Sequence, residues 1–308
     1  MANLKEMAKQ EERLCGGHRA CAGCGIPIIV RQVMHAIKDP VVVGSATGCL
    51  EVVTTIFPYT AWKVPFIHNA FENAAATVSG VETAYNVLKK KGKISRDIKF
   101  VAFGGDGGTY DIGFQSLSGA MERGHDMLYV CYNNEAYMNT GVQRSSATPY
   151  GANTTTAPAG KVKQGKQQFP KDLTACMVAH NIPYVAQAAV GNWMDLTRKI
   201  EKAMTIKGPK FIGVLQPCQL GWGYPMKDTV ELGKIAIETC FWPLYEVENG
   251  VYKLTYKPKE KKPVVEWLKL QSRFRHLFKP GNEKILEMIQ ADVDKNWNDL
   301  LKKCGEAQ

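Results

Sequence analysis

The sequence predicts an α/β protein built on a doubly wound, mostly parallel sheet, followed by a C-terminal arm. Between about residue 20 and residue 220, short apolar segments alternate with amphipathic stretches of helical length. The apolar segments are almost uninterrupted, which is typical of strands covered by helices on both faces. From Pro243 onward the pattern changes, so we divide the chain into a main domain, residues 1–242, and a C-terminal arm, residues 243–308.

The predicted elements of the main domain follow one another in strict alternation, after a polar lead-in over residues 1–19 and without an internal repeat. Each helix is amphipathic and each strand is apolar along its length, as expected for a sheet buried between two helical layers. The order is helix 26–37, strand 40–44, helix 72–89, strand 98–103, helix 110–123, strand 127–132, helix 172–180, strand 183–188, helix 193–206 and strand 210–215.

Two segments depart from this alternation. Residues 137–170 are rich in Thr, Gly, Ala and Pro and lack periodicity. Irregular loops longer than about 12–15 residues are uncommon in compact domains, so we predict an active-site loop here. In the arm, Asn249-Gly250 indicates a two-residue hairpin, and helices are predicted near 264–276 and 282–303. These elements are too few to enclose a core, so we expect the arm to pack on a partner subunit.

A glycine turn carries the first candidate site. Gly105-Asp106-Gly107 follows one apolar strand, and Asn134 ends the next. Bare glycine backbone lets a diphosphate approach closely, and the N-terminus of the following helix favours anions. One carboxylate and one amide oxygen at two strand ends are suitable ligands for Mg²⁺ that also binds diphosphate. This spacing resembles the motif for thiamine diphosphate, and two unrelated strand-to-helix turns are the alternative.

Cysteines form the second candidate site. Nine cysteines in an intracellular chain argue against a disulfide framework and for metal or redox roles of some of them. Cys21 and Cys24 form a C-x-x-C motif, while Cys49 and Cys218 follow the first and last strands. In open α/β sheets such strand ends share one edge. Four thiolates there suit a [4Fe–4S] cluster or structural zinc, with the cluster favoured beside a thiamine site and Cys15 as a rival fourth ligand.

Composition narrows the class of protein. The formal net charge is +10, but the lysines concentrate in loops and tails, without an arginine-rich or aromatic-interleaved motif. We therefore expect a solvated surface, or a docking face for an acidic electron carrier, and no nucleic acid. No apolar run reaches the ~20 residues of a membrane span, and the charged residues 1–13 do not resemble a signal peptide. We expect a cytoplasmic protein without membrane contact.

With both sites in view, the chain closely resembles the β subunit of the 2-oxoacid:ferredoxin oxidoreductases, particularly the pyruvate-type enzymes. Oxalate oxidoreductase is built on the same scaffold. The similarity extends over nearly the whole chain, in GHRACAGCG, ATGCLEVV, YTAWKVPFIHNAFENAA, GGDGGTYDIG, NNEAYMNTGVQRSSATPYGA, the Cys218 segment and LKLQSRFRHLFK.

The resemblance assigns roles by position. Cys21, Cys24, Cys49 and Cys218 match the cluster ligands, and the Asn139 amide matches a catalytic group near the reactive carbon, where it would stabilise developing negative charge. His68 is a candidate contact to cofactor phosphate, although helix capping or packing would also explain it. The matching Mg²⁺ ligands are the Asp106 and Asn134 side chains and the Ala136 carbonyl, and further cofactor contacts are expected from Gly48, Gly105, Gly107, Gly108, Asn139 and Thr140.

The implied reaction is the reversible oxidative decarboxylation of a 2-oxoacid at thiamine diphosphate, with single electrons passing through the cluster to ferredoxin. Pyruvate, with CoA accepting the acetyl group, is the first expectation, and oxalate, cleaved to two CO₂ without CoA, is the alternative. An electron-transfer module without thiamine chemistry and a zinc-stabilised nucleic-acid-binding protein are the alternatives from other classes.

Partner subunits are expected because one part of a thiamine site is missing. In this family a separate pyrimidine-binding domain supplies the glutamate that activates the cofactor, and no such second domain fits within 308 residues. We expect an α subunit that carries this glutamate, γ- and δ-type subunits with further clusters, and ferredoxin. The isolated chain should be inactive.

Overall fold

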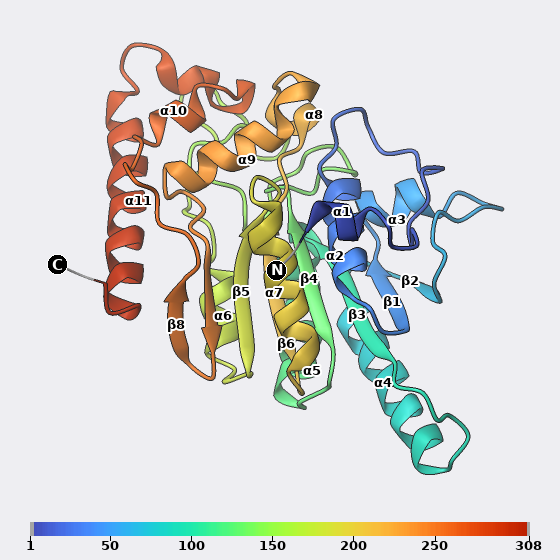
Figure 1. Ribbon diagram of the computed structural model, residues 1–308. Coiled ribbons are helices and arrows are strands. Elements are labelled where there is room, and N and C mark those ends of the chain that lie inside the picture. The colour runs from blue at the N-terminus through green and yellow to red at the C-terminus, as the bar shows by residue number, and fades with distance from the viewer. Residues whose placement is uncertain (1–2, 307–308) are drawn as a thin grey trace.

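The computed structural model describes residues 3–306 and confirms the α/β class and the mostly parallel sheet (Figure 1). Its centre is a sheet of eight strands in the order β2-β1-β3-β4-β6-β5-β7-β8. The strands from β2 to β5 in this order are parallel, and β7 and β8 are antiparallel to their neighbours. The strands are β1 Val41–Ala46, β2 Phe66–Asn69, β3 Lys99–Gly105, β4 Leu128–Asn133, β5 Tyr184–Ala189, β6 Lys210–Leu215, β7 Tyr245–Glu248 and β8 Val251–Leu254.

Helices cover both faces of this sheet. On one face α2 packs against α7, and on the other α4 packs against α5. The α-helices are α1 Leu4–Met7, α2 Ile26–Ala36, α3 Cys49–Thr54, α4 Ala74–Lys90, α5 Phe114–Glu122, α6 Leu173–Val178, α7 Trp193–Thr205, α8 Gln219–Trp222, α9 Thr229–Glu238, α10 Val265–Leu268 and α11 Glu283–Lys303; η1 Gly107–Ile112 is π-helical, and η2 Met226–Asp228 and η3 Ser272–Phe278 are 3₁₀-helices.

Alternate side chains of each central strand enter opposite cores. In β3, Val101 and Phe103 join the core beneath α2 and α7, whereas Phe100 and Ala102 join the core beneath α4 and α5. All four are buried, which explains why the strand is apolar without interruption. A third apolar cluster, formed largely by α8 to α11 and η3, covers the carboxyl ends of β5 and β6.

Several local elements differ from the sequence prediction. Strand β2 was not predicted, because it has four residues at a sheet edge and only Asn69 in it is buried. The expected helix 110–123 begins earlier, as the π-helical turn η1, and is interrupted at Gly113, where a Cβ would lie 2.4 Å from the Gly108 carbonyl oxygen. The expected helix 264–276 is divided into α10 and η3.

The C-terminal arm is joined to the main sheet. Its hairpin forms at the predicted turn, where Asn249 and Gly250 both have positive φ, and β7 pairs with β5. Helix α11 places Trp297 and Leu300 in the core beneath α4 and α5. Figure 1 shows the arm, in orange and red, continuing the sheet and flanking it. Packing of the arm on another subunit remains a prediction.

The loop over residues 137–170 forms no helix or strand in the described chain. Its side chains are nevertheless partly buried, with Ser145 and Thr148 fully enclosed and Lys166 only 2% exposed. Residues 137–140 also line the pocket described below. Within residues 3–306, no helix combines the length and the apolarity needed to cross a bilayer.

Replacing Ile212 with Ala should reduce the free energy of unfolding by about 2–5 kcal/mol, because the side chain lies fully buried in the middle of β6. Equilibrium unfolding in urea, followed by circular dichroism, measures the loss. The control Val251→Ala removes methyl groups from a residue that is 69% exposed at the sheet edge and should change stability by at most about 0.5 kcal/mol. Equal losses in both variants would contradict the proposed core.

Candidate functional site

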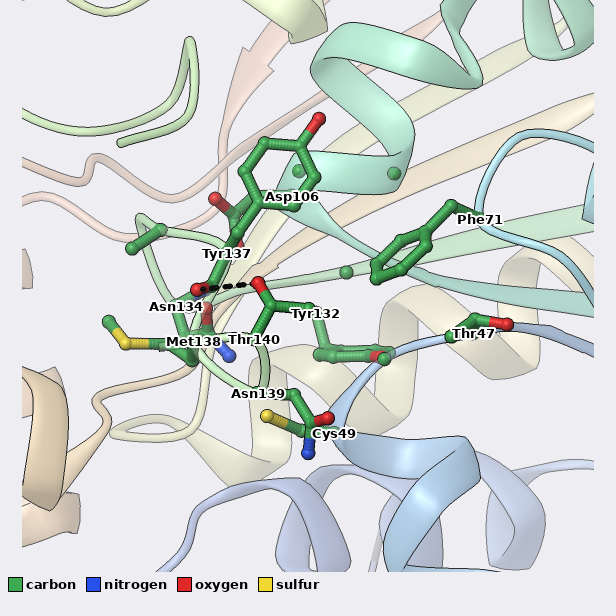
Figure 2. Close-up of a pocket in the computed structure, with 15 residues that line it drawn as sticks. Thr47, Cys49, Phe71, Asp106, Tyr132, Asn134, Tyr137, Met138, Asn139 and Thr140 are labelled. Atoms are coloured by element: carbon green, nitrogen blue, oxygen red, sulfur yellow. Dashed lines mark hydrogen bonds between the residues drawn. The ribbon is translucent and has the colours of Figure 1, made fainter. Parts of the chain in front are cut away.

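A pocket with about 300 Å³ of empty volume lies where the carboxyl ends of β1, β3 and β4 meet (Figure 2). Gly105 of β3 pairs with Tyr132 of β4, so Asp106 and Asn134 leave the sheet from adjacent strands. Nearly all of the predicted cofactor contacts line this pocket, namely Gly48, Gly105, Asp106, Gly107, Gly108, Asn134, Ala136, Asn139 and Thr140.

Three oxygen atoms converge at one point of this pocket. Oδ1 of Asn134 lies 2.9 Å from Oδ1 of Asp106 and 2.9 Å from the carbonyl oxygen of Ala136. Turning the amide would direct its NH₂ group at both oxygens, whereas the present orientation brings three acceptors together. Neighbouring ligands of an octahedral Mg²⁺ with bonds of about 2.1 Å are about 3 Å apart. Both distances from Asn134 Oδ1 therefore suit neighbouring ligands of a hard cation.

The Asp106 carboxylate is electrostatically unfavourable without a cation. Burial raises its pKa to about 7, although the Ser145 hydroxyl donates to Oδ2 at 2.5 Å and the Asn134 N–H donates to Oδ1 at 3.3 Å. The ion pairs found within residues 3–306 do not include Asp106. Buried carboxylates are usually paired or bound to metal. This residue therefore fits the role of a metal ligand.

Two glycines give the pocket its shape. Gly48 has φ of 157°, and a Cβ there would lie 2.8 Å from the Tyr132 hydroxyl oxygen. A Cβ on Gly107 would lie 2.4 Å from the Tyr137 ring. Any larger residue would fill the space between these aromatic side chains and the backbone. The pocket thus presents main-chain atoms at close range, as binding of a diphosphate group requires.

Aromatic residues that were not predicted complete the walls. Phe71 and Tyr137 face each other with ring centroids 6.0 Å apart at an angle of 61°, and Thr47, Tyr132 and Met138 also line the pocket. Tyr137 and Met138 lie in the predicted active-site loop, so the loop assignment pointed to the region. Phe71 and Tyr132 carried no such signal, because apolar aromatic residues of this kind are usually core residues.

The mouth of the pocket carries Asn139 and Thr140, and both side chains are exposed. The Thr140 hydroxyl donates to the Tyr137 carbonyl at 3.4 Å, as the dashed line in Figure 2 shows. The Asn139 amide makes no hydrogen bond within the described chain, so it is available to a ligand.

His68 is placed differently from the expected phosphate contact. Its Nε2 atom lies 3.0 Å from the Thr47 hydroxyl and 3.6 Å from a Glu51 carboxylate oxygen. Of these three residues, only Thr47 lines the pocket. His68 thus contacts the wall of the pocket through Thr47, and a direct contact to phosphate remains a prediction.

The four predicted cluster cysteines lie near one another at this edge. Burial raises the pKa of the Cys24 and Cys49 thiols to about 12, and charges on the other three thiols contribute in the case of Cys49. Cys49 also lines the pocket, and Cys218 is the residue before α8. No three His, Cys, Asp or Glu side chains in residues 3–306 are arranged to share one ion. A four-iron cluster does not require that, because each thiolate binds a different iron.

The C-x-x-C turn is held by the C-terminal half of the main domain. Gly23 has φ of 78°, and a Cβ there would lie 2.4 Å from the Met226 carbonyl oxygen. The Thr229 hydroxyl donates to the Gly23 carbonyl, and the Cys24 N–H donates to the Cys21 carbonyl at 3.0 Å. These contacts bring the N-terminal cysteines to the segment that follows Cys218. All nine cysteines are free, and Cys15 donates to the Ala61 carbonyl.

A known protein family matches the part of the chain that contains the pocket. Residues 44–214, more than half of the chain, match the family model described as "Thiamine pyrophosphate enzyme, C-terminal TPP binding domain". That range contains the oxygen triad and Cys49 but not the other three predicted cluster ligands.

Curated relatives match along almost their entire length. The chain is 55% identical over 288 residues to pyruvate synthase subunit PorB of Methanocaldococcus jannaschii, covering 93% of this chain and 95% of that protein. It is 55% identical over 310 residues to the PorB subunit of Thermotoga maritima, covering 97% and 95%. It is 43% identical over 298 residues to ketoisovalerate oxidoreductase subunit VorB of Pyrococcus abyssi, covering 96% and 94%.

One solved structure supports the fold. A 2-oxoglutarate:ferredoxin oxidoreductase from Magnetococcus marinus, with 2-oxoglutarate, coenzyme A and succinyl-CoA bound, has a TM-score of 0.56 and 24% sequence identity, covering 67% of this chain and 66% of that one. At this identity, the similarity establishes the architecture alone.

Asp106→Asn should stabilise the cofactor-free chain more at about pH 8 than at about pH 5. Folding raises the Asp106 pKa to about 7, so stability is present below the unfolded-state pKa and is lost as pH rises through the folded-state pKa. Asn avoids that loss. Urea unfolding at the two pH values measures the difference.

The control for this experiment is Asp97→Asn, because that side chain is 78% exposed and its pKa is lowered by a hydrogen bond from Lys89. Its effect on stability should be the same at both pH values. An Asp106→Asn advantage that does not grow with pH would show that the buried carboxyl is not titrating as described.

Proposed function

Since this chain belongs to the 2-oxoacid:ferredoxin oxidoreductases as a β-type subunit, we propose that it holds Mg²⁺–thiamine diphosphate and a [4Fe–4S] cluster for the oxidative decarboxylation of pyruvate. The observation that carries the proposal is the meeting of three acceptor oxygens beside a glycine-lined pocket. A pure electron-transfer module would have no use for such a triad.

The Mg²⁺–diphosphate end of the cofactor would be held by the oxygen triad and the glycine turns. Asp106 supplies the negative charge, and Asn134 and Ala136 supply neutral oxygens, which is a donor set that leaves other positions of Mg²⁺ for diphosphate and water. The bound cation would favour the ionised form of Asp106 and offset its burial. When bound, thiamine diphosphate supplies the carbanion chemistry needed to cleave the bond beside a 2-oxo group.

Substrate would be received at the mouth of the pocket. Asn139 is exposed there, and its free amide can donate to a substrate oxygen that becomes more negative during the reaction. Phe71 and Tyr137 form apolar walls that limit access of water on this side. We therefore assign the catalytic contact to Asn139, and the shielding of the substrate from water to Phe71 and Tyr137.

The cluster would accept electrons beside this pocket. Cys21, Cys24, Cys49 and Cys218 supply four thiols from three segments of the chain, which matches the ligand number of a [4Fe–4S] cluster. Cys49 lines the same pocket as Asn139, so the two proposed sites share a wall. This arrangement supports short-range passage of single electrons from the reaction site to the cluster.

Pyruvate is favoured as substrate because the two relatives that are 55% identical are pyruvate synthase subunits, whereas the ketoisovalerate oxidoreductase subunit is 43% identical. All three relatives are subunits of larger enzymes. We propose that this chain likewise acts within an assembly, with an α subunit that supplies the activating glutamate, γ- and δ-type subunits with further clusters, and ferredoxin as acceptor.

The reconstituted complex should reduce ferredoxin with pyruvate and CoA and should show no activity with oxalate in the absence of CoA. The chain alone should be inactive with either acid, because no glutamate among the described residues lines its pocket. Reduction of ferredoxin or an artificial dye, followed by absorbance, measures both. Turnover of oxalate by the complex would reassign the substrate, and turnover of pyruvate by the chain alone would disprove the need for the α subunit.

Cys218→Ser should abolish or strongly reduce the broad absorbance at roughly 400 nm of the chain purified without oxygen, and lower its iron content from about four atoms per chain. Cys176→Ser, in α6, is the control and should retain both, because that cysteine lies away from the predicted ligands. Iron and zinc analysis accompany the spectra. A colourless wild-type chain that contains about one zinc ion would establish a zinc site instead.

A further inference from the structure

A buried ion pair lies directly behind the oxygen triad. Glu135, between Asn134 and Ala136, accepts a hydrogen bond from Nη2 of Arg273 at 2.5 Å. The two side chains are 2% and 3% exposed, and the residues are 138 positions apart in the chain. The C-terminal arm therefore contacts the turn that carries two of the three proposed Mg²⁺ ligands.

Glu135 itself adopts an unusual conformation. Its φ is 64°, a region that residues with side chains rarely occupy. Its N–H donates to Oδ1 of Asn133 at 2.9 Å, and its carbonyl accepts from the Thr148 hydroxyl at 2.6 Å. Such conformations persist where surrounding contacts hold them, and they are frequent at functional sites. Here the conformation directs the Asn134 and Ala136 oxygens toward Asp106.

The Arg273 guanidinium is held in turn by an aromatic cage. It lies 3.9 Å from the centroid of the Trp222 ring and 4.9 Å from that of Phe274, and its Nε donates to Gln271 at 2.9 Å. Trp222 Nε1 donates to the Asn134 carbonyl at 2.8 Å. Arg273 and Trp222 thus stack on each other, and they hold the turn through hydrogen bonds to Glu135 and Asn134.

The charge of Glu135 explains why Arg273 is needed for the geometry of the turn. Both side chains are almost fully buried, so removal of Arg273 would leave a carboxylate without its partner. The turn would then have to rearrange to hydrate that carboxylate, and the Asn134 and Ala136 oxygens would move with it. A purely apolar replacement would preserve neither the hydrogen bond nor the balance of charge.

We propose that Arg273 is a positioning residue for Mg²⁺–thiamine diphosphate, acting through Glu135 and Trp222 on the Asn134 and Ala136 oxygens without touching the cofactor. The inference rests on the proposed function, because it assumes that the triad binds Mg²⁺. It assigns to the C-terminal arm a part in cofactor binding, in addition to any part in subunit packing. Residues that orient metal ligands typically change metal affinity by about 10–100-fold when replaced.

The test measures thiamine diphosphate binding to the assembled complex, stripped of cofactor, by calorimetric titration at fixed Mg²⁺. Arg273→Lys keeps the charge but loses the planar contact with Trp222 and Glu135. Trp222→Phe keeps an aromatic ring under Arg273 but removes the N–H donated to the Asn134 carbonyl, together with part of the buried indole. Both variants should bind thiamine diphosphate about 10–100-fold more weakly than wild type and require more Mg²⁺ for half-saturation. With Mn²⁺ as probe, electron paramagnetic resonance should show more free ion.

A matched control separates this role from simple stability. Lys199 and Asp195 form another buried pair in α7, with Nζ–Oδ2 of 2.6 Å and exposures of 1% and 7%. Lys199→Arg alters a buried pair in the same conservative manner but away from the triad. It should lower the thermal midpoint and leave the affinity for thiamine diphosphate and Mn²⁺ unchanged.

The outcomes are distinguishable. If the wild-type complex binds no thiamine diphosphate in the presence of Mg²⁺, the proposed function fails and the inference fails with it. If wild type binds, and both Arg273→Lys and Trp222→Phe bind equally well, the inference alone is wrong. Should Arg273→Lys not fold, Trp222→Phe decides the question. Weakening by Lys199→Arg to the same extent would reduce the effect to stability and would also overturn the proposal.

Discussion

Burial of the Asp106 carboxylate is the constraint around which the site is organised. The side chain is fully enclosed, and its pKa is raised to about 7 despite two hydrogen bonds that favour the charged form. Two further acceptor oxygens, from Asn134 and Ala136, crowd the same point. Such an arrangement is unfavourable for the empty protein and favourable with a bound divalent cation. The burial of this carboxylate therefore lowers the stability of the chain at neutral pH, and the proposed cation would offset that cost.

The parallel sheet makes this concentration of polar groups possible. Because β1, β3 and β4 run in the same direction, their carboxyl ends meet at one edge, where backbone groups no longer pair with a neighbouring strand. Gly48, Asp106 and Asn134 all follow these ends, and Cys49 lies beside them. Both faces of the sheet are covered by apolar cores, which hold the edge in place. At that edge, the Asp106 and Ala136 oxygens each lie 2.9 Å from Asn134 Oδ1.

The C-terminal arm both extends the sheet and contacts the turn that carries the triad. Its hairpin extends the sheet, and its 3₁₀ segment brings Arg273 against Glu135 and Trp222. The arm thus contributes to the conformation of a turn that lies 138 residues earlier in the chain. A division at residue 242 separates the elements along the chain, but the hydrogen bonds of β5 and β7 cross that point. The geometry of the oxygen triad and the packing of the arm are therefore physically linked.

The sequence by itself determined the elements whose causes are local. Uninterrupted apolar runs predicted the central strands, and the glycine turn and its spacing to Asn134 predicted most of the pocket lining, including Asp106 and Ala136 once the family resemblance was recognised. Sequence also indicated the hairpin at Asn249-Gly250, because the turn needs two residues that tolerate positive φ.

Only the tertiary structure decided how distant segments combine. Short edge strand β2, the aromatic walls and the contact of His68 with Thr47 depend on neighbours that no local pattern specifies. Arg273 lies in a stretch that was predicted only as an amphipathic helix, yet its side chain is buried against Glu135. Periodicity reports which face of an element is apolar, whereas pairing across 138 residues depends on how the completed layers pack. That packing forms the Arg273–Glu135 ion pair next to the triad. The ion pair in turn holds the turn conformation in which the three oxygens meet.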